Sequence, residues 1–101
     1  MSMTERIENN LLIQVSGIDL EKVTKLEFYV KQVGAVFQYE PKVRSATEMT
    51  VTIPYEDAMK IRHGSVQMQF AFVDETGRPD SSDIISVDVN EFLKEAGYDP
   101  V

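Results

Sequence analysis

The sequence predicts an all-β domain, an antiparallel sandwich built from six short strands. Apolar and polar residues alternate with a period of two in several segments, which is typical of strands that bury one face. Glycine or proline separates these segments at intervals of about ten residues, the spacing of strands in a sandwich. Strands do not alternate with long helical segments, so a parallel α/β sheet is not expected.

The first three predicted strands occupy residues 10–16, 25–32 and 35–40. The first is mostly apolar and is followed by Gly17. The second, KLEFYVKQ, alternates strictly, which indicates a half-buried strand. Gly34 separates the second from the third and can adopt a positive φ, so these two strands are expected to form a hairpin.

Three more strands are predicted at residues 47–53, 65–73 and 83–89, and all of them alternate. Residues 55–64 break this period, with acidic residues first, basic residues last and Gly64 at the end. That order of charges favours a short helical turn. We expect the turn to carry the chain from one sheet to the other.

These elements predict an immunoglobulin-like antiparallel β-sandwich with a short helical crossover turn and a short C-terminal helix. The C-terminal helix is expected over residues 90–97, with Asn90 as its N-cap and Gly97 at its end. A single domain over residues 1–101 suits the chain length, and residues 1–9 are expected to be flexible. The predicted core consists of the inward-facing apolar residues Leu26, Phe28, Val30, Phe37, Met49, Val51, Ile53, Val66, Met68, Phe70, Phe72, Ile85 and Val87.

The densest cluster of potentially reactive side chains, with four acidic residues and two serines, lies at residues 72–84. A calcium-binding EF-hand loop needs acidic residues at alternate positions and a glycine at its sixth, but counting from Asp74 the third residue is Thr76 and the sixth is Pro79. The segment fits a hairpin loop better, with Asp74 opening the turn and Gly77 in the left-handed conformation. We therefore predict a hairpin here and no functional metal site.

The composition argues against most enzyme classes. The absence of cysteine excludes disulfides and thiolate metal sites. The one histidine, His63, is expected to be an exposed turn residue, because no nucleophile motif surrounds the nearby Ser65. Glycine-rich phosphate-binding loops are also missing. We therefore expect no enzymatic activity, no catalytic residues and no cofactor.

Charge and hydropathy limit the partners and the location. The net charge of −7 opposes binding to nucleic acid or to anionic lipid. No apolar run approaches the ~20 residues that cross a membrane, and the polar, acidic N-terminus does not resemble a signal peptide. The expected location is therefore cytoplasmic at synthesis, with neither nucleic acid nor membrane as a partner.

A series of strands and turns in the second half of the chain matches a known pattern. A strand at residues 51–53 is followed by a turn at 56–61, the strand VQMQFAFVD, a glycine–serine hairpin and the strand ISVDV. This order resembles small proteins encoded in prophages and tailed phages of Gram-positive bacteria, over roughly residues 11–93. Pro54 and Tyr55 depart from it, since the family more often has leucine and threonine there. The resemblance implies an immunoglobulin-like component of the virion or its assembly, from the tail or baseplate region, with no catalytic residues.

Protein–protein contact in virion or tail assembly is therefore the expected function, with other phage proteins or a second copy as the partner and the virion as a further location. The alternative is a carbohydrate- or surface-binding module of the same fold. The contact surface is predicted on the strands at 10–16, 25–32 and 35–40, because the first has no charge or proline to protect its edge. The predicted interaction residues on these strands are Ile13, Tyr29, Val36 and Gln38.

Overall fold

The computed structural model describes residues 2–83 and 85–90, which form nine strands and one helical turn. The strands are β1 (Ser2–Thr4), β2 (Asn9–Gln14), β3 (Lys25–Gln32), β4 (Ala35–Tyr39), β5 (Lys42–Val43), β6 (Glu48–Ile53), β7 (Gly64–Val73), β8 (Pro79–Ser81) and β9 (Ile85–Asn90). The helical turn α1 (Tyr55–Ala58) lies between β6 and β7. The helix predicted over residues 90–97 falls, beyond Asn90, outside the described residues.

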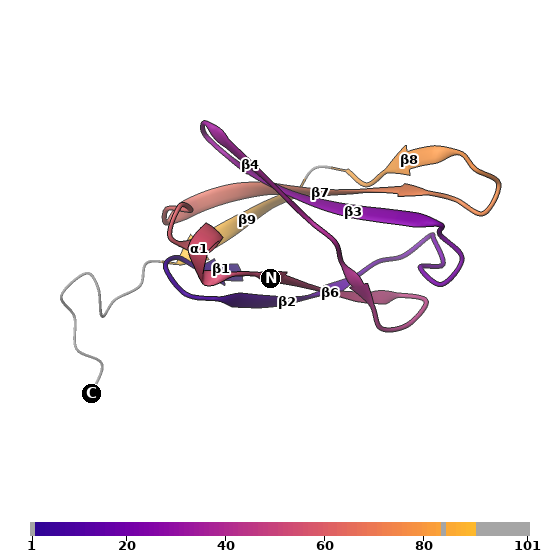
Figure 1. Cartoon of the computed structure of the whole chain (residues 1–101), viewed down its shortest axis with the longest axis horizontal. Coiled ribbons are helices and arrows are strands. Elements are labelled where there is room, and N and C mark those ends of the chain that lie inside the picture. The colour runs from indigo at the N-terminus through magenta and orange to yellow at the C-terminus, as the bar shows by residue number, and fades with distance from the viewer. Residues whose placement is uncertain (1, 84, 91–101) are drawn as a thin grey trace.

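Two sheets pack against each other, and Figure 1 shows β2 and β6 of the smaller sheet below β3 and β7 of the larger. The large sheet has six strands in the order β1-β9-β7-β3-β4, with β8 also paired to β7, and the small sheet has three, β2-β6-β5. Paired strands are antiparallel except for β1 and β9, which are parallel. This arrangement is that of an immunoglobulin-like sandwich, in which strands in the order β9-β7-β3-β4 lie opposite strands in the order β2-β6-β5. β1 is an additional strand beside β9, at the edge of the large sheet. The predicted all-β sandwich is thus confirmed.

Apolar side chains from both sheets and from the connections fill the space between the sheets. The buried apolar residues are Met3, Leu11, Ile13, Leu20, Phe28, Val30, Met49, Val51, Ile53, Ala58, Ile61, Val66, Met68, Phe72, Val87 and Val89. Leu26, Phe37 and Phe70 were also predicted as core, and they pack against this cluster as half-buried residues. Residues 1–9 were expected to be flexible, but Met3 of β1 is buried in the core and β1 pairs with β9.

Among the predicted core residues, Ile85 is the one that the structure leaves exposed, with 47% of its surface accessible to solvent. Its partner across the β7–β9 pair is Met68, which is buried. Because directly opposed residues in an antiparallel pair lie on the same face, Ile85 was assigned to the correct face. It is exposed because that part of the large sheet extends beyond the cover of the small sheet.

The hairpin of β3 and β4 forms as predicted, with Phe28 opposite Tyr39 and Gln32 opposite Ala35. Gly34 in its turn has a φ of +79°, a conformation that favours glycine. In Figure 1 the tip of this hairpin projects beyond the two layers of the sandwich. The register places the outward-facing side chains of β3 and β4 side by side on the large sheet.

The predicted crossover turn is present as α1, which joins β6 of the small sheet to β7 of the large sheet. The backbone N–H of Ala58 donates to the carbonyl of Pro54 at 2.9 Å, and Ala58 and Ile61 are both buried. The Tyr39 hydroxyl donates to a carboxylate oxygen of Asp57 at 2.8 Å. This contact ties the crossover to the edge strand of the large sheet.

The acidic stretch forms the predicted hairpin, because β8 pairs with the end of β7. The Asp74 carboxylate accepts hydrogen bonds from the Thr76 hydroxyl (2.6 Å) and from the backbone N–H groups of Thr76 and Arg78 (both 2.9 Å). The Thr76 hydroxyl and the N–H groups of Arg78, Thr76 and Gly77 lower the pKa of the Asp74 carboxyl. The acidic side chain therefore organises the turn.

Replacing Phe28 with alanine is expected to lower the free energy of unfolding by about 3–5 kcal/mol, because the ring is 2% exposed and its loss leaves a cavity. Urea unfolding followed by circular dichroism measures this loss. The matched control is Phe70→Ala, the same change at a half-buried ring, which should cost less. Equal losses would contradict the placement of Phe28 at the centre of the core and Phe70 at its margin.

Asp74→Asn is expected to destabilise the fold near neutral pH and to have little effect in acid. The lowered folded-state pKa means that this carboxylate contributes stability above its unfolded pKa of about 4 and loses that contribution as the pH falls through the folded value. The difference in melting temperature between parent and variant should therefore shrink as the pH falls from about 7 to about 2. Glu75→Gln is the control, and an equal pH dependence in both variants would argue against this role for Asp74.

Candidate functional site

The structure separates the four predicted interaction residues into two groups. Tyr29 lies on β3 and Val36 and Gln38 lie on β4, so these three are neighbours on the large sheet. Ile13 lies on β2 in the small sheet, faces the core and is 8% exposed. The predicted surface of three adjoining strands is therefore wrong. The outward-facing residue beside Ile13 is Leu12, which is 54% exposed.

The outer face of the large sheet brings a set of mostly uncharged side chains together. Tyr29 pairs with Gln38 on β4 and with Gln69 on β7, and in the next row Lys31 pairs with Val36 and Gln67. Opposed residues share a face, so these six side chains form one surface. We call this surface, made of Tyr29, Lys31, Val36, Gln38, Gln67 and Gln69, the Tyr29 face. A shallow hollow of about 290 Å³ lies on it, and Val36 is 63% exposed.

A chain of polar contacts along β3 holds the Tyr29 ring at the margin of this face. The Tyr29 hydroxyl donates a hydrogen bond to the Glu27 carboxylate, and the Lys25 Nζ lies 3.1 Å from the Glu27 Oε1. The hydrogen bond from Tyr29, and then that from Lys25, lowers the pKa of Glu27. The same bond to Glu27 raises the pKa of Tyr29. Tyr29 therefore stays protonated at neutral pH, whereas a phenol that acts as a nucleophile needs a lowered pKa.

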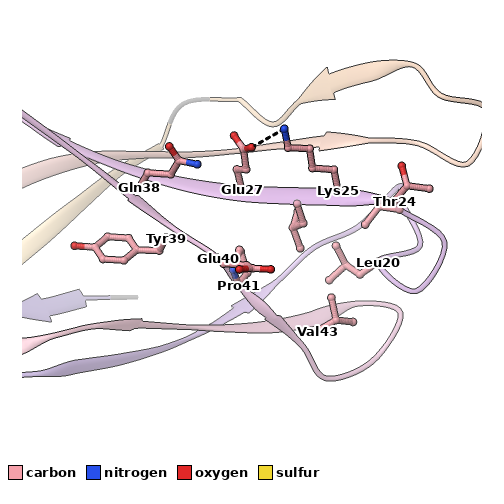
Figure 2. Close-up of a pocket in the computed structure, with 11 residues that line it drawn as sticks. Leu20, Thr24, Lys25, Glu27, Gln38, Tyr39, Glu40, Pro41 and Val43 are labelled. Carbon is pink, nitrogen blue, oxygen red and sulfur yellow. Dashed lines mark ion pairs between the residues drawn. The ribbon is translucent and has the colours of Figure 1, made fainter.

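A larger hollow of about 730 Å³ lies beside the β3–β4 edge and β5. Figure 2 shows that Lys25, Glu27 and Gln38 lie above the β3 ribbon, while Tyr39, Glu40, Leu20 and Val43 lie below it. The polar side chains are thus divided between the two sides of a strand and do not surround one ligand. The hollow is the open side of the sandwich and carries no convergent set of reactive groups.

Tyr39 also borders this hollow, but its hydroxyl points away from the other labelled side chains in Figure 2. It donates instead to Asp57 of α1, at 2.8 Å. Burial first, and then this hydrogen bond, raises the pKa of Tyr39. Tyr39 therefore stays protonated at neutral pH and contributes to the packing of the crossover.

His63 is exposed, as predicted, and has a partner that the sequence did not indicate. Its Nδ1 lies 3.4 Å from the Glu5 Oε2, and its backbone N–H donates to the same oxygen at 2.9 Å. Glu5 itself is buried. The pair connects the turn after β1 to the turn before β7. Because the two residues are 58 positions apart, no local sequence pattern could predict this contact.

Within residues 2–83 and 85–90, no three or more histidine, cysteine, aspartate or glutamate side chains are grouped so that they could hold a metal ion. Over the same part of the chain, the structure contains no helix of the length and apolar character that a membrane span requires.

Comparison with models of known protein families and with curated proteins finds no match for this chain. The candidate site therefore rests on the geometry and chemistry of the chain's own residues. Three of the four predicted interaction residues, Tyr29, Val36 and Gln38, lie together on the Tyr29 face, which is therefore the candidate site.

Replacing Glu27 with glutamine is expected to lower the pKa of Tyr29 towards that of an ordinary tyrosine, because the charged acceptor that stabilises the protonated phenol is removed. A pH titration of the Tyr29 ring by NMR measures this shift. Asp57→Asn is the matched control, since it should change the titration of Tyr39 and leave Tyr29 as it was. An unchanged Tyr29 titration in Glu27→Gln would show that Glu27 does not control this hydroxyl.

Proposed function

We propose that this protein is a non-enzymatic structural or accessory protein of phage origin that acts by protein–protein contact in virion or tail assembly. The phage assignment rests on the pattern of strands and turns in residues 11–93. The mode of action rests on the Tyr29 face. Other phage proteins are the partners in this proposal, and the virion is the final location.

The observation that supports protein contact is the low charge of the Tyr29 face. Charged residues make up 27% of the chain and give it a net charge of −7, yet Lys31 is the one charged residue among the six of this face. The cores of protein interfaces are depleted in charged residues and enriched in tyrosine, because charges are costly to remove from water. Glutamine side chains can both donate and accept hydrogen bonds to a partner. The face therefore has the chemistry of an interface core.

The arrangement of the face also favours a protein over a small ligand. Its residues lie on three neighbouring strands, and its hollow of about 290 Å³ is lined by one sheet alone and bordered by Tyr29 and Val36. Small-molecule sites are usually concave and enclose most of the ligand. A carbohydrate-binding module is the second candidate, and the half-buried, outward-facing Tyr29 ring is the feature that would serve it.

The proposal is tested by co-expressing the protein with each product of the genes beside its own and measuring co-purification. Tyr29→Lys and Val36→Lys should each reduce the recovered complex at least tenfold, because each places an unpaired charge in the interface. Thr52→Lys is the matched control, since it adds the same charge to the outer face of the small sheet, at an exposed position of its central strand β6, and should have no effect.

The proposal fails if both variants remain folded by circular dichroism and recover their partners as well as the parent does. Binding of the parent to a glycan array, lost in Tyr29→Ala, would establish the carbohydrate-binding alternative in its place.

A further inference from the structure

The β2 strand leaves one edge of the small sheet open. Its pairing to β6 continues past Gln14, where the backbone N–H of Val15 donates to the carbonyl of Thr47 at 2.8 Å. Backbone groups alternate in direction along an antiparallel strand, so those of Asn10, Leu12 and Gln14 point away from β6. Within the part of the chain that the structure describes, no strand pairs with this side of β2.

An apolar groove runs beside this open edge, between the end of β2 and the β8–β9 segment of the large sheet. Its volume is about 430 Å³. Ile13 borders it on β2, Phe70 and Phe72 form its base on β7, and Ile85 forms the opposite wall. The Phe70 and Phe72 rings lie 5.9 Å apart. Since Ile85 faces inward and is still half exposed, the groove is an uncovered strip of the sandwich interior.

Ser82 interrupts the strand that forms the far wall of this groove. Its N–H donates to the Phe70 carbonyl at 2.9 Å, and its hydroxyl accepts from the Phe70 N–H at 3.0 Å. A side-chain oxygen thus takes the place of a backbone carbonyl at this point of the β7 ladder. The Gln69 side-chain amide also donates to the Ser82 carbonyl, at 2.9 Å. β8 ends and β9 begins on either side of this contact, so the wall is held in place by specific hydrogen bonds.

The end of the groove nearest the C-terminus of β2 is acidic. Asp80 and Asp83 line the groove itself. The groove continues into a hollow of about 160 Å³, which shares Ile18 and Phe72 with it. The charged residues of that hollow are Asp19, Lys22, Asp74 and Glu75. We call the five carboxylates Asp19, Asp74, Glu75, Asp80 and Asp83 the acidic rim, and Lys22 is the one basic residue lining either hollow.

We propose that this groove accepts an extended segment of a partner protein, which adds to β2 as a further strand of the small sheet. The segment would hydrogen-bond to the backbone of Leu12 and Gln14 and place alternate apolar side chains in the groove. Lysine or arginine at one end of the segment would lie beside the acidic rim. Gln69 is the one residue of the Tyr29 face that also supports this groove, through its hydrogen bond to Ser82. The inference otherwise rests on other residues and goes beyond the function proposed for that face.

The geometry favours a strand over other occupants. The outward backbone groups of β2 recur at every second residue, about 6.8 Å apart, which is the repeat of a second strand. Such unpaired groups are a template for an added chain, and the neighbouring pockets read its alternate side chains. A second copy of this chain is disfavoured, because two molecules of net charge −7 would bring their acidic surfaces together.

The test selects binders of the protein from a displayed library of random peptides. Enriched peptides should carry apolar residues at alternate positions and lysine or arginine at one end. A labelled synthetic copy of the most enriched peptide should then bind in fluorescence anisotropy. A copy with N-methyl groups on alternate backbone nitrogens should bind at least tenfold more weakly, because it cannot pair with a strand. Hydrogen exchange at Leu12 and Gln14 should slow on binding.

Three variants of the protein test the separate contacts. Leu12→Pro removes an outward N–H without breaking a bond to β6, and Ile85→Lys places a charge in the groove, so each should raise the Kd at least tenfold. Asp83→Lys should weaken binding mainly at low salt, where charge attraction is strongest.

Val36→Lys changes a residue of the Tyr29 face and is the control, for which peptide binding should be unchanged. Circular dichroism verifies folding, and Ile85→Lys tests the groove should Leu12→Pro fail to fold.

The proposal is overturned if the library yields no enriched peptides, or if the enriched peptides lack alternation and bind Ile85→Lys as well as the parent. Light scattering provides a further test. A dimer that dissociates in Ile85→Lys and persists in Val36→Lys would show that a second copy occupies the groove, which would also overturn the proposed partner.

Discussion

A three-stranded sheet must cover the inner face of a six-stranded one, and much of this molecule follows from that mismatch. The small sheet packs over the central strands of the large sheet, where Phe28, Val30 and Met68 are buried. Beyond the edge of β2 the cover ends, and Ile85 remains half exposed although it faces inward. Val87 and Val89 of the same strand, β9, are buried, so the uncovered strip is confined to the part of the large sheet around Ile85 and Phe70.

The two candidate surfaces differ in what they offer a partner. On the Tyr29 face a partner can be contacted only through side chains, because β3 is paired on both sides and its backbone groups are hydrogen-bonded to β4 and β7. Along β2 the backbone itself is available, together with the apolar groove beneath it. A nearly uncharged face suits another folded protein, whereas an open edge suits an extended segment. The two proposals therefore assign a different kind of partner to each surface.

Polar side chains hold the connections between strands in place through hydrogen bonds. Asp74 binds the hydroxyl and backbone N–H groups of its own loop, and Asp57 accepts from Tyr39 across the fold. Glu5, although buried, accepts from the backbone of His63. Each of these carboxylates has a hydrogen-bond donor, and for the buried Glu5 this bond offsets the cost of removing the charge from water. None of them belongs to either candidate surface except Asp74, which contributes to the acidic rim.

The strands at 25–32 and 35–40, the crossover turn and the hairpin at Asp74 were determined by the sequence itself, because alternation, turn residues and charge order act between near neighbours. Alternation also placed Tyr29, Val36 and Gln38 on one face. Tertiary structure alone decided that the first strand joins the other sheet, since Leu11, Leu12 and Ile13 are all apolar and give no period that shows which face is buried. It also decided that Ile85 is uncovered, because coverage depends on how far a distant sheet extends. Contacts across the whole fold determine which strands pair and how far a sheet extends. These features therefore cannot be predicted from a local sequence pattern.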